Sequence, residues 1–268
     1  MTRRGDAQTF LPGRAVFQAL YQELGPQGWW PAQTGFEMII GSVLVQHTAW
    51  RNVETSLQNL VQAQALTPRS IAGMKQEDLV SLIRPSGFMQ AKAGTCQAIS
   101  RWLMDTGLDE SVIWPEDGSQ AAGDPQPPLP DLRENLLSVK GIGQETADVI
   151  RLYAFHQKCF IWDVYSRRMI AALGLPDYPT YQAAKDHEAA FLDISEFTLP
   201  ELGEYHGLIV EAGKRSRAAG SWEWLTPVKA AQTAFRIREM NIWSVPWTCS
   251  KSCTSPGAAG KGVPEGKA

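Results

Sequence analysis

The sequence has few cysteines, no long apolar run and no strong excess of either charge, and each of these shortages excludes a class of protein. Its four cysteines (Cys96, Cys159, Cys249 and Cys253) are too few for a disulfide scaffold and suit a reducing compartment such as the cytoplasm. The longest apolar run, Phe36 to Val45, is too short to cross a membrane. The first residues also lack the apolar segment of a secretory signal, so we expect a cytoplasmic protein with no membrane partner.

The net charge of −3 is only a weak argument against a nucleic acid partner, because the charge is unevenly distributed. Residues 107–131 hold six acidic residues and no basic one, so the rest of the chain is net positive. Basic side chains gather at Arg167-Arg168 and between Lys214 and Arg217. Phosphate binding requires a local patch of this kind and not a high overall charge. The sequence assigns no role to the acidic segment.

Apolar residues recur at helical spacing along nearly the whole chain, which predicts an all-α fold. One such face runs from Phe36 to Leu44 and another from Val53 to Val61. No stretch alternates apolar and polar residues between tight turns, as a β-hairpin would. Proline, glycine and aspartate predict a surface loop at 115–130, and the composition of 244–268 predicts a disordered tail.

The most informative stretch runs from Leu136 to Asp148 and predicts a helix–hairpin–helix. An apolar helix end enters Gly141-Ile142-Gly143, and a second helix begins directly afterwards. The glycines leave the turn bare, while the first N–H groups of the second helix point outward at the positive end of its dipole. Such a turn binds one phosphate of a DNA backbone, and the residues expected there are Lys140, Gly141, Ile142, Gly143, Gln144, Glu145 and Thr146. The plainer interpretation is a turn that only joins two helices.

Asp163 follows Gly143 by twenty residues and begins the segment Asp-Val-Tyr-Ser-Arg-Arg-Met. Taken alone, an aspartate in this position is read as a helix N-cap. With the hairpin beside it, Asp163 is a candidate catalytic residue, because a carboxylate can stabilise a cationic sugar and orient or deprotonate a water molecule. The two roles are compatible.

The hairpin and Asp163 together resemble the helix–hairpin–helix DNA glycosylase superfamily, whose best-known member is endonuclease III. Leu44-Val45-Gln46-His47-Thr48 looks like the family's glutamine-containing helix junction, and Ile83 to Phe88 with Lys92 matches another family segment, in the family's order. The resemblance implies two helical lobes, with Asp163 in the cleft between them. A six-helix barrel lobe is expected at 34–155, with the hairpin at 136–150, and a second helical lobe at 1–33 plus 156–243.

Two departures from the family pattern concern the chemistry. Members that also cut the DNA backbone carry a lysine on the second hairpin helix, and Glu145 stands there in this chain. A carboxylate cannot form the Schiff base that β-elimination requires. The family's iron–sulfur motif, Cys-x6-Cys-x2-Cys-x5-Cys, should begin near Arg217, yet no cysteine lies between Cys159 and Cys249. We therefore expect neither lyase activity nor an iron–sulfur cluster or other cofactor.

A third feature resembles the 3-methyladenine DNA glycosylase III branch. Trp29-Trp30-Pro31 precedes the Phe36 helix and Trp50 follows it, and in that branch aromatics at these positions stack on the flipped base. Indole faces attract an electron-poor, often cationic, alkylated purine. Family position also implies that Gln46 fills the gap left by the nucleotide and that Lys214 contacts phosphate or the cleft.

Each of these residues also has a plainer interpretation. The tryptophans can be core residues, Gln46 a helix-end polar residue, Lys214 a surface lysine and Glu145 a partner of the helix dipole. His47 and His206 are read as structural histidines.

The resulting hypothesis is a monomeric, monofunctional DNA N-glycosylase of base excision repair. It would flip an alkylated purine such as 3-methyladenine out of damaged duplex DNA and cleave the bond to the sugar C1′ with water. The alternative enzyme is an endonuclease III-like glycosylase for oxidised or mismatched pyrimidines. The alternative of another class is a non-catalytic helix–hairpin–helix DNA-binding protein. The exact lesion and a monovalent cation at the hairpin stay open.

Overall fold

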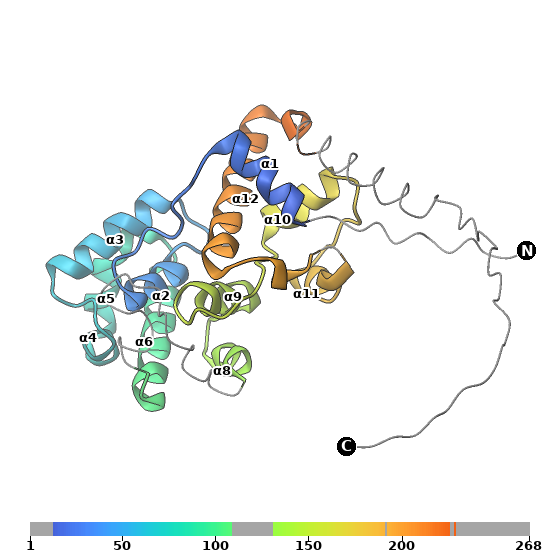
Figure 1. The fold of residues 1–268 in the computed structure, drawn as a ribbon. Helices are drawn as coiled ribbons and strands as arrows, with labels where there is room; N and C mark the ends of the chain where they lie inside the picture. The colour runs from blue at the N-terminus through green and yellow to red at the C-terminus, as the bar shows by residue number, and fades with distance from the viewer. Residues whose placement is uncertain (1–12, 109–130, 191, 226–227, 229–268) are drawn as a thin grey trace, which may run out of the picture.

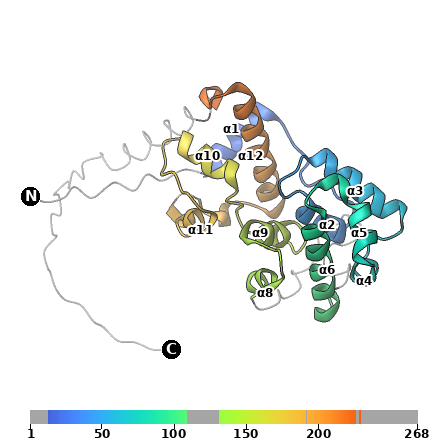
Figure 2. The same ribbon diagram turned by 180° about the vertical axis from the view of Figure 1, so that it is seen from behind.

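The computed structural model describes residues 13–108, 131–190, 192–225 and 228, and every regular element in these residues is a helix (Figure 1). The predicted all-α fold is therefore confirmed. The helices form two lobes, with α2 to α6 in one and α1, α10 and α12 in the other (Figures 1 and 2). The described part includes no helix long and apolar enough to span a membrane. The loop expected at 115–130 and the tail expected at 244–268 lie outside the described residues.

The described α-helices are α1 (Gly13–Leu24), α2 (Gly35–Leu44), α3 (Trp50–Gln62), α4 (Pro68–Gly73), α5 (Gln76–Leu82), α6 (Met89–Thr106), α8 (Leu132–Ser138), α9 (Gln144–Tyr153), α10 (Val164–Ala172), α11 (Tyr181–Lys185) and α12 (Leu199–Ala219). Short 3₁₀ turns are η1 (Arg84–Ser86), η2 (Glu188–Ala190), η3 (Ile194–Glu196) and η4 (Glu223–Leu225).

Helix α2 is the centre of the first lobe. All of its residues except Glu37 are buried, and it contacts α3, α6 and α9. Thr34 begins the helix, because its Oγ1 accepts the Glu37 N–H at 3.1 Å and satisfies a donor that the helix leaves unpaired. On α3, Val53 and Leu60 belong to the buried face, but Val61 is 55% exposed. The predicted apolar face therefore ends before Val61.

Helix α12 is the centre of the second lobe, and α1 and α10 pack against it. It begins with a capping box, in which Thr198 Oγ1 accepts the Glu201 N–H at 3.3 Å and the Glu201 carboxylate accepts the Thr198 N–H at 2.9 Å. A Cβ at Gly207 would lie 2.7 Å from Trp29 Cβ. The glycine therefore allows the segment between α1 and α2 to pack directly against α12.

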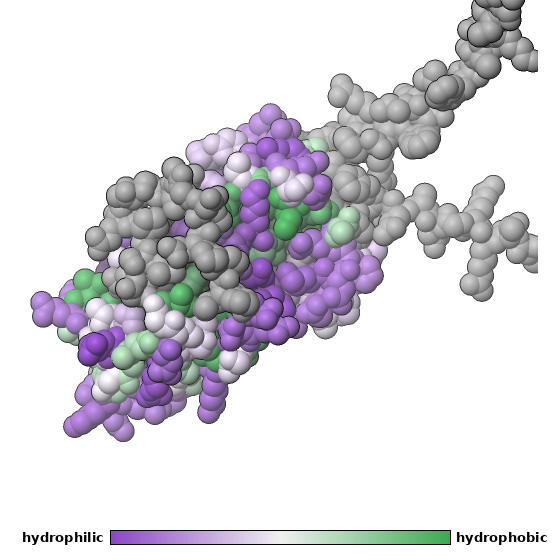
Figure 3. All heavy atoms as spheres, turned by 60° about the horizontal axis from the view of Figure 1, so that its bottom comes forward, coloured by the Kyte–Doolittle hydropathy of each residue, from purple (hydrophilic) through white to green (hydrophobic). Residues whose placement is uncertain are grey.

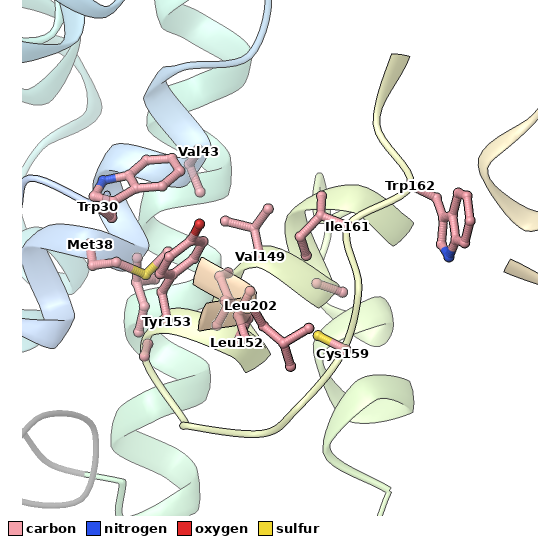
Figure 4. Close-up of a cluster of buried hydrophobic side chains, with 14 of the residues drawn as sticks. Trp30, Met38, Val43, Val149, Leu152, Tyr153, Cys159, Ile161, Trp162 and Leu202 are labelled. Carbon is pink, nitrogen blue, oxygen red and sulfur yellow. The ribbon is translucent and has the colours of Figure 1, made fainter. Parts of the chain in front are cut away.

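Helix α9 joins the lobes, since it contacts both α2 and α12. At its end the Tyr153 ring lies 5.5 Å from the Trp30 ring, and Leu202 of α12 lies nearby in the same apolar cluster (Figure 4). The molecular face in Figure 3 is mostly hydrophilic, with small separate apolar areas. The buried apolar residues form one cluster, which runs through the junction of the lobes.

A buried carboxylate fixes α9 to its neighbours. The Asp148 side chain has no exposed surface, and it accepts hydrogen bonds from Arg133 Nε at 3.0 Å, Arg151 Nη1 at 2.7 Å and Tyr181 Oη at 2.9 Å. Lys185 Nζ lies 3.3 Å away. Burial alone would raise the pKa of Asp148, but these cations lower it below its ordinary value. Breaking one of these pairs would leave a buried charge uncompensated. Asp148 therefore joins α9 to α8 through Arg133 and to α11 through Tyr181 and Lys185.

Candidate active site and DNA-binding surface

The hairpin between α8 and α9 uses its two glycines differently. Gly141 has a φ of +92°, and a Cβ there would overlap the Thr95 side chain of α6. Gly143 is the N-cap of α9 and has open space where a Cβ would be. Gly141 therefore lets the turn bend against α6, and Gly143 leaves the first N–H groups of α9 uncovered.

The residues expected at the phosphate divide into an outer and an inner set. Lys140, Gly141, Gly143 and Glu145 are exposed and Gln144 is half-buried, whereas Ile142 and Thr146 are buried. The side chains of Ile142 and Thr146 therefore anchor the turn, and only their backbones remain for phosphate. Thr146 Oγ1 also accepts a hydrogen bond from Gln46 Nε2 at 3.1 Å. This bond joins the α2–α3 junction to the hairpin.

A cavity of about 220 Å³ lies between that junction and the hairpin, lined by Gln46, His47, Phe88, Ala91, Lys92, Thr95 and Gly141. Two of its residues have left-handed backbones, His47 with φ +56° and Phe88 with φ +47°. Their rings lie 6.2 Å apart, and Phe88 is 69% exposed. The sequence analysis included Phe88 in the family segment Ile83 to Phe88 but gave it no role of its own. The sequence does not show that this phenylalanine is exposed.

Lys92 holds the two loops of this cavity. Its buried Nζ donates to the carbonyl oxygens of Leu44 at 2.8 Å and Ser86 at 2.7 Å. Burial lowers the pKa of Lys92 below its ordinary value. The lysine satisfies carbonyl groups at the end of α2 and in η1, so it positions Gln46 and Phe88 without reaching the surface.

Asp163 is the N-cap of α10, as one of its two interpretations predicted. Its Oδ1 accepts the Ser166 N–H at 2.7 Å, and the residue is 5% exposed. Its Oδ2 lies 4.0 Å from His206 Nε2 on α12. Capping uses one carboxylate oxygen, so the other is available for chemistry at the interface of α10 and α12.

His206 connects Asp163 to the core. Its Nδ1 lies 2.9 Å from Tyr153 Oη, and that hydroxyl also donates to the Gly203 carbonyl oxygen at 2.9 Å. A carbonyl oxygen can only accept, so donation by Tyr153 to Gly203 leaves Nδ1 to carry the imidazole hydrogen. Burial lowers the pKa of His206 below its ordinary value, although the charge of Asp163 opposes this shift. Sequence reasoning read His206 as structural and missed its contact with the carboxylate.

Glu145 lies in the first turn of α9. The residue is exposed at the surface, but protein atoms crowd its carboxylate. This desolvation, together with the negative charge of Asp163, raises the pKa of Glu145 to about 7, although Arg167 opposes the shift. The carboxyl is therefore poised to exchange a proton near neutral pH, which the dipole interpretation did not predict.

Trp29, Trp30 and Trp50 form one aromatic cluster. The Trp30 and Trp50 rings are 5.3 Å apart and nearly perpendicular, and the Trp29 ring is 5.5 Å from Trp30 and 6.4 Å from Trp50. Trp30 is buried, Trp29 and Trp50 are half-buried, and Pro31 is exposed outside these ring contacts. The Trp29 ring also lies 6.2 Å from that of His206. The cluster is therefore contiguous with Asp163 through His206.

The indole N–H groups of the cluster differ in their partners. Trp50 Nε1 donates to Glu54 Oε1 at 2.8 Å. The Nε1 atoms of Trp29 and Trp30 are buried and have no hydrogen-bond partner within the described residues. An unpaired buried donor costs free energy. A Cβ on Gly41 of α2 would lie 3.6 Å from Trp30 Nε1, so that donor faces the interior of the lobe.

Lys214 belongs to this cluster and not to the hairpin. Its Nζ lies 5.7 Å from the centre of the Trp29 ring and 3.6 Å from Glu211 Oε2. Its expected contact with phosphate or the cleft stays a prediction. The cavity beside Gln46 is lined neither by Asp163 nor by the tryptophan cluster, and Glu145 is the hairpin residue that feels the charge of Asp163.

The cysteines do not suit a four-cysteine iron–sulfur cluster. Cys96 and Cys159 are each free and buried, and burial raises the pKa of both thiols to about 12. Across the described ranges, no three His, Cys, Asp or Glu residues come together in a group that could hold a metal. Cluster ligands are thiolates, and no cysteine occurs between Cys159 and Cys249.

A glycine hairpin with an uncovered helix N-terminus, an aspartate capping the next helix and an aromatic cluster beside it occur together in this molecule. The profile of the HhH-GPD superfamily of base excision DNA repair proteins matches residues 40–191. The chain belongs to this superfamily. It is a DNA repair glycosylase with DNA as its substrate, and the family predicted from the hairpin is confirmed.

Three relatives illustrate the range of the superfamily. A Methanocaldococcus jannaschii protein named as a candidate DNA repair glycosylase is 34% identical over 204 residues, which cover 75% of this chain and 86% of the relative. The structure of Helicobacter pylori 3-methyladenine DNA glycosylase bound to 1,N6-ethenoadenine is 29% identical, with a TM-score of 0.57, over 76% of this chain and 98% of that one. A non-covalent endonuclease III–DNA complex has a TM-score of 0.63 at 19% identity, over 84% and 96% of the chains.

Proposed function

We propose that this glycosylase is monofunctional and removes alkylated purines such as 3-methyladenine. The observation that carries the proposal is the tryptophan cluster contiguous with Asp163 through His206. Stacking on indole favours electron-poor bases, and it is strongest for cationic ones. The likeness to the 3-methyladenine glycosylase bound to ethenoadenine supports the same substrate class.

Charges around the cluster also favour a cationic base. The positive charge of Lys214 is offset by the Glu211 carboxylate 3.6 Å away, so it repels such a base only weakly. Glu145 is partly ionised at neutral pH, because its pKa is about 7. A base bound here thus finds stacking and negative charge.

In the proposed reaction, Asp163 stabilises the cationic sugar that forms as the base leaves. Its Oδ2 is free of the capping bond, and it can orient or deprotonate the water that attacks C1′. An alkylated purine already has a weakened glycosidic bond, so little acid catalysis is needed. Glu145 occupies the place of the family's lysine, and a carboxylate cannot form an imine. The product is an abasic site with an intact backbone.

Base flipping requires a group to fill the gap in the duplex, and two residues are candidates. Gln46 is the residue expected from the sequence, but its amide is tied to Thr146. Phe88 is 69% exposed beside the hairpin, and apolar side chains commonly insert between bases. We assign the insertion to Phe88, with Gln46 supporting the loop beside it.

A panel of duplexes tests the proposal directly. Each duplex carries one lesion (3-methyladenine, ethenoadenine, an oxidised pyrimidine or a mismatched thymine) and is incubated with purified protein, with and without subsequent alkali. We expect strand breaks only at the alkylated purines and only after alkali. Excision confined to the pyrimidines would assign the endonuclease III-like alternative, and no excision with intact binding would assign a non-catalytic DNA-binding protein.

Two further measurements address lyase activity and the cofactor. Borohydride should trap no covalent protein–DNA complex, because no lysine stands at position 145. A trapped complex that disappears in Lys140→Ala would make Lys140 the nucleophile and overturn the monofunctional assignment. Freshly purified protein should lack the visible absorption of an iron–sulfur cluster, and size-exclusion chromatography should show a monomer.

A further inference from the structure

A second cavity, of about 190 Å³, lies between α10 and the C-terminal end of α12. It is lined by Tyr165, Arg168, Gly213, Ser216, Arg217, Gly220, Ser221 and Trp222. Gly213 shapes it, since a Cβ there would overlap the Tyr165 ring. Both views of the ribbon show α10 and α12 side by side at this point (Figures 1 and 2). None of its lining residues is acidic, so the cavity is basic.

The two arginines of this cavity, Arg168 and Arg217, differ from the nearby Arg167 and Arg215 in having no side-chain partner within the described residues. Arg167 donates to the Tyr178 and Pro179 carbonyl oxygens, and Arg215 pairs with Glu23 at 2.9 Å. The exposed guanidinium groups of Arg168 and Arg217 have no hydrogen bond or ion pair within the described residues. Two free guanidinium groups at one cavity are a typical anion site, because their donor geometry matches phosphate.

The cavity lies on the same helices as the reacting groups. Arg168 follows Asp163 by five residues on α10, about 7.5 Å along the helix axis at 1.5 Å per residue. Arg217 lies on α12, which also carries His206. One DNA strand carries one phosphate for each 3.4 Å or so of rise. If the lesion-bearing strand runs along α10 from a sugar at Asp163, a phosphate about two nucleotides away lies near Arg168.

We propose that this cavity binds a backbone phosphate of the lesion-bearing strand, close to the flipped nucleotide. The hairpin then holds one phosphate and the α10–α12 cavity holds another, on the two sides of Asp163. The C-terminal end of α12 is the negative end of its dipole, so the two arginines must supply the attraction. The proposal rests on this chain acting on duplex DNA, and it holds for any lesion.

A methylphosphonate scan tests the proposal. Each phosphate flanking a tetrahydrofuran abasic analogue is replaced in turn by a neutral methylphosphonate, and duplex affinity is measured for wild type and for Arg168→Gln/Arg217→Gln. We expect one or two positions at which neutralisation weakens wild-type binding roughly tenfold, the size of one charge-assisted contact. The double variant should be insensitive at those positions but should still respond at the hairpin phosphate. For the double variant, the slope of log affinity against log salt concentration should also be shallower by about 0.9, the value for one lost phosphate contact.

A matched control removes two exposed charges from the other lobe, in Arg69→Gln/Lys75→Gln. This control should keep the wild-type scan and salt slope, and both double variants should keep the wild-type melting temperature. The proposal is wrong if the Arg168/Arg217 variant loses affinity at the same methylphosphonate positions as wild type. It is also wrong if the control variant changes the salt dependence of affinity by the same amount. The scan measures affinity for an abasic analogue and requires no excision. It can therefore be interpreted even if the lesion panel shows no removal of alkylated purines.

Discussion

His206 Nε2 on α12 lies 4.0 Å from Asp163 Oδ2 on α10, and the opposite side of the imidazole lies 2.9 Å from Tyr153 Oη on α9. The carboxylate proposed for catalysis is thus held by its own helix through Oδ1, and at Oδ2 it faces a buried neutral ring whose Nε2 carries no hydrogen and donates no bond to it. Burial keeps His206 neutral by lowering its pKa. The negative charge of Asp163 is therefore not cancelled at neutral pH.

Asp163→Asn should leave duplex binding nearly unchanged and lower single-turnover excision by orders of magnitude. The amide oxygen can still accept the Ser166 N–H that Oδ1 accepts at 2.7 Å, but it carries no charge to stabilise the sugar cation. Asp193→Asn is the matched control, because Asp193 caps η3 through Ser195 N–H at 2.9 Å. Excision by Asp163→Asn at the wild-type rate would show that Asp163 is only a cap.

His206→Gln should lower single-turnover excision roughly ten- to a hundredfold with little change in DNA affinity, because a flexible amide replaces the rigid ring that packs beside Asp163 Oδ2 and against Trp29. Wild-type excision should also fall on the acid side, below the ordinary histidine pKa of 6.5, as imidazolium neutralises Asp163. His206→Gln should not show this fall in excision rate at low pH. Tyr153→Phe removes the hydroxyl next to Nδ1 and should change the pH at which the fall occurs. An unchanged pH profile in both variants would leave His206 with a purely structural role.

The hairpin and the cap of α10 could be predicted from the sequence because both are local. A side chain at Gly141 would overlap Thr95, and Gly143 leaves the end of α9 uncovered. Asp163 directly precedes the helix that it caps. Helical periodicity likewise predicted the all-α fold. The Val61 error has the same origin, because an apolar residue at the edge of a helical face can lie on either side of the burial boundary.

The remaining contacts depend on tertiary structure, and the local sequence has no signal for them. His206 and Asp163 are far apart in the chain, and they meet only because α10 packs on α12. The placement of Lys214 over Trp29 and the crowding around Glu145 arise in the same way. A motif can therefore predict which residues are used, but the pairing of a carboxylate with its neighbours requires the fold.

DNA affinity should weaken by a few-fold as the pH rises from 6 to 8. Glu145 is protonated below its pKa of about 7 and ionised above it, so raising the pH adds a negative charge beside the phosphate that the hairpin binds. Glu145→Gln should remove this dependence. Glu134→Gln, which removes an exposed carboxylate from the first turn of α8, should retain it. An identical pH dependence in wild type and Glu145→Gln would exclude Glu145 as its source.

Trp50→Ala should reduce excision of 3-methyladenine much more than it reduces binding to an abasic-site analogue, because the analogue has no base to stack. One base stack is worth roughly 1–3 kcal/mol, a loss of about one to two orders of magnitude. Trp102→Ala is the matched control, since Trp102 is a half-buried tryptophan on α6 whose ring lies 6.3 Å from Phe155, in a different aromatic pair. It should lower the melting temperature without changing the ratio of excision to analogue binding.

Equal losses for both ligands in Trp50→Ala, with a lowered melting temperature, would identify Trp50 as a core residue. The substrate assignment would then rest on Trp29, the other half-buried indole of the cluster.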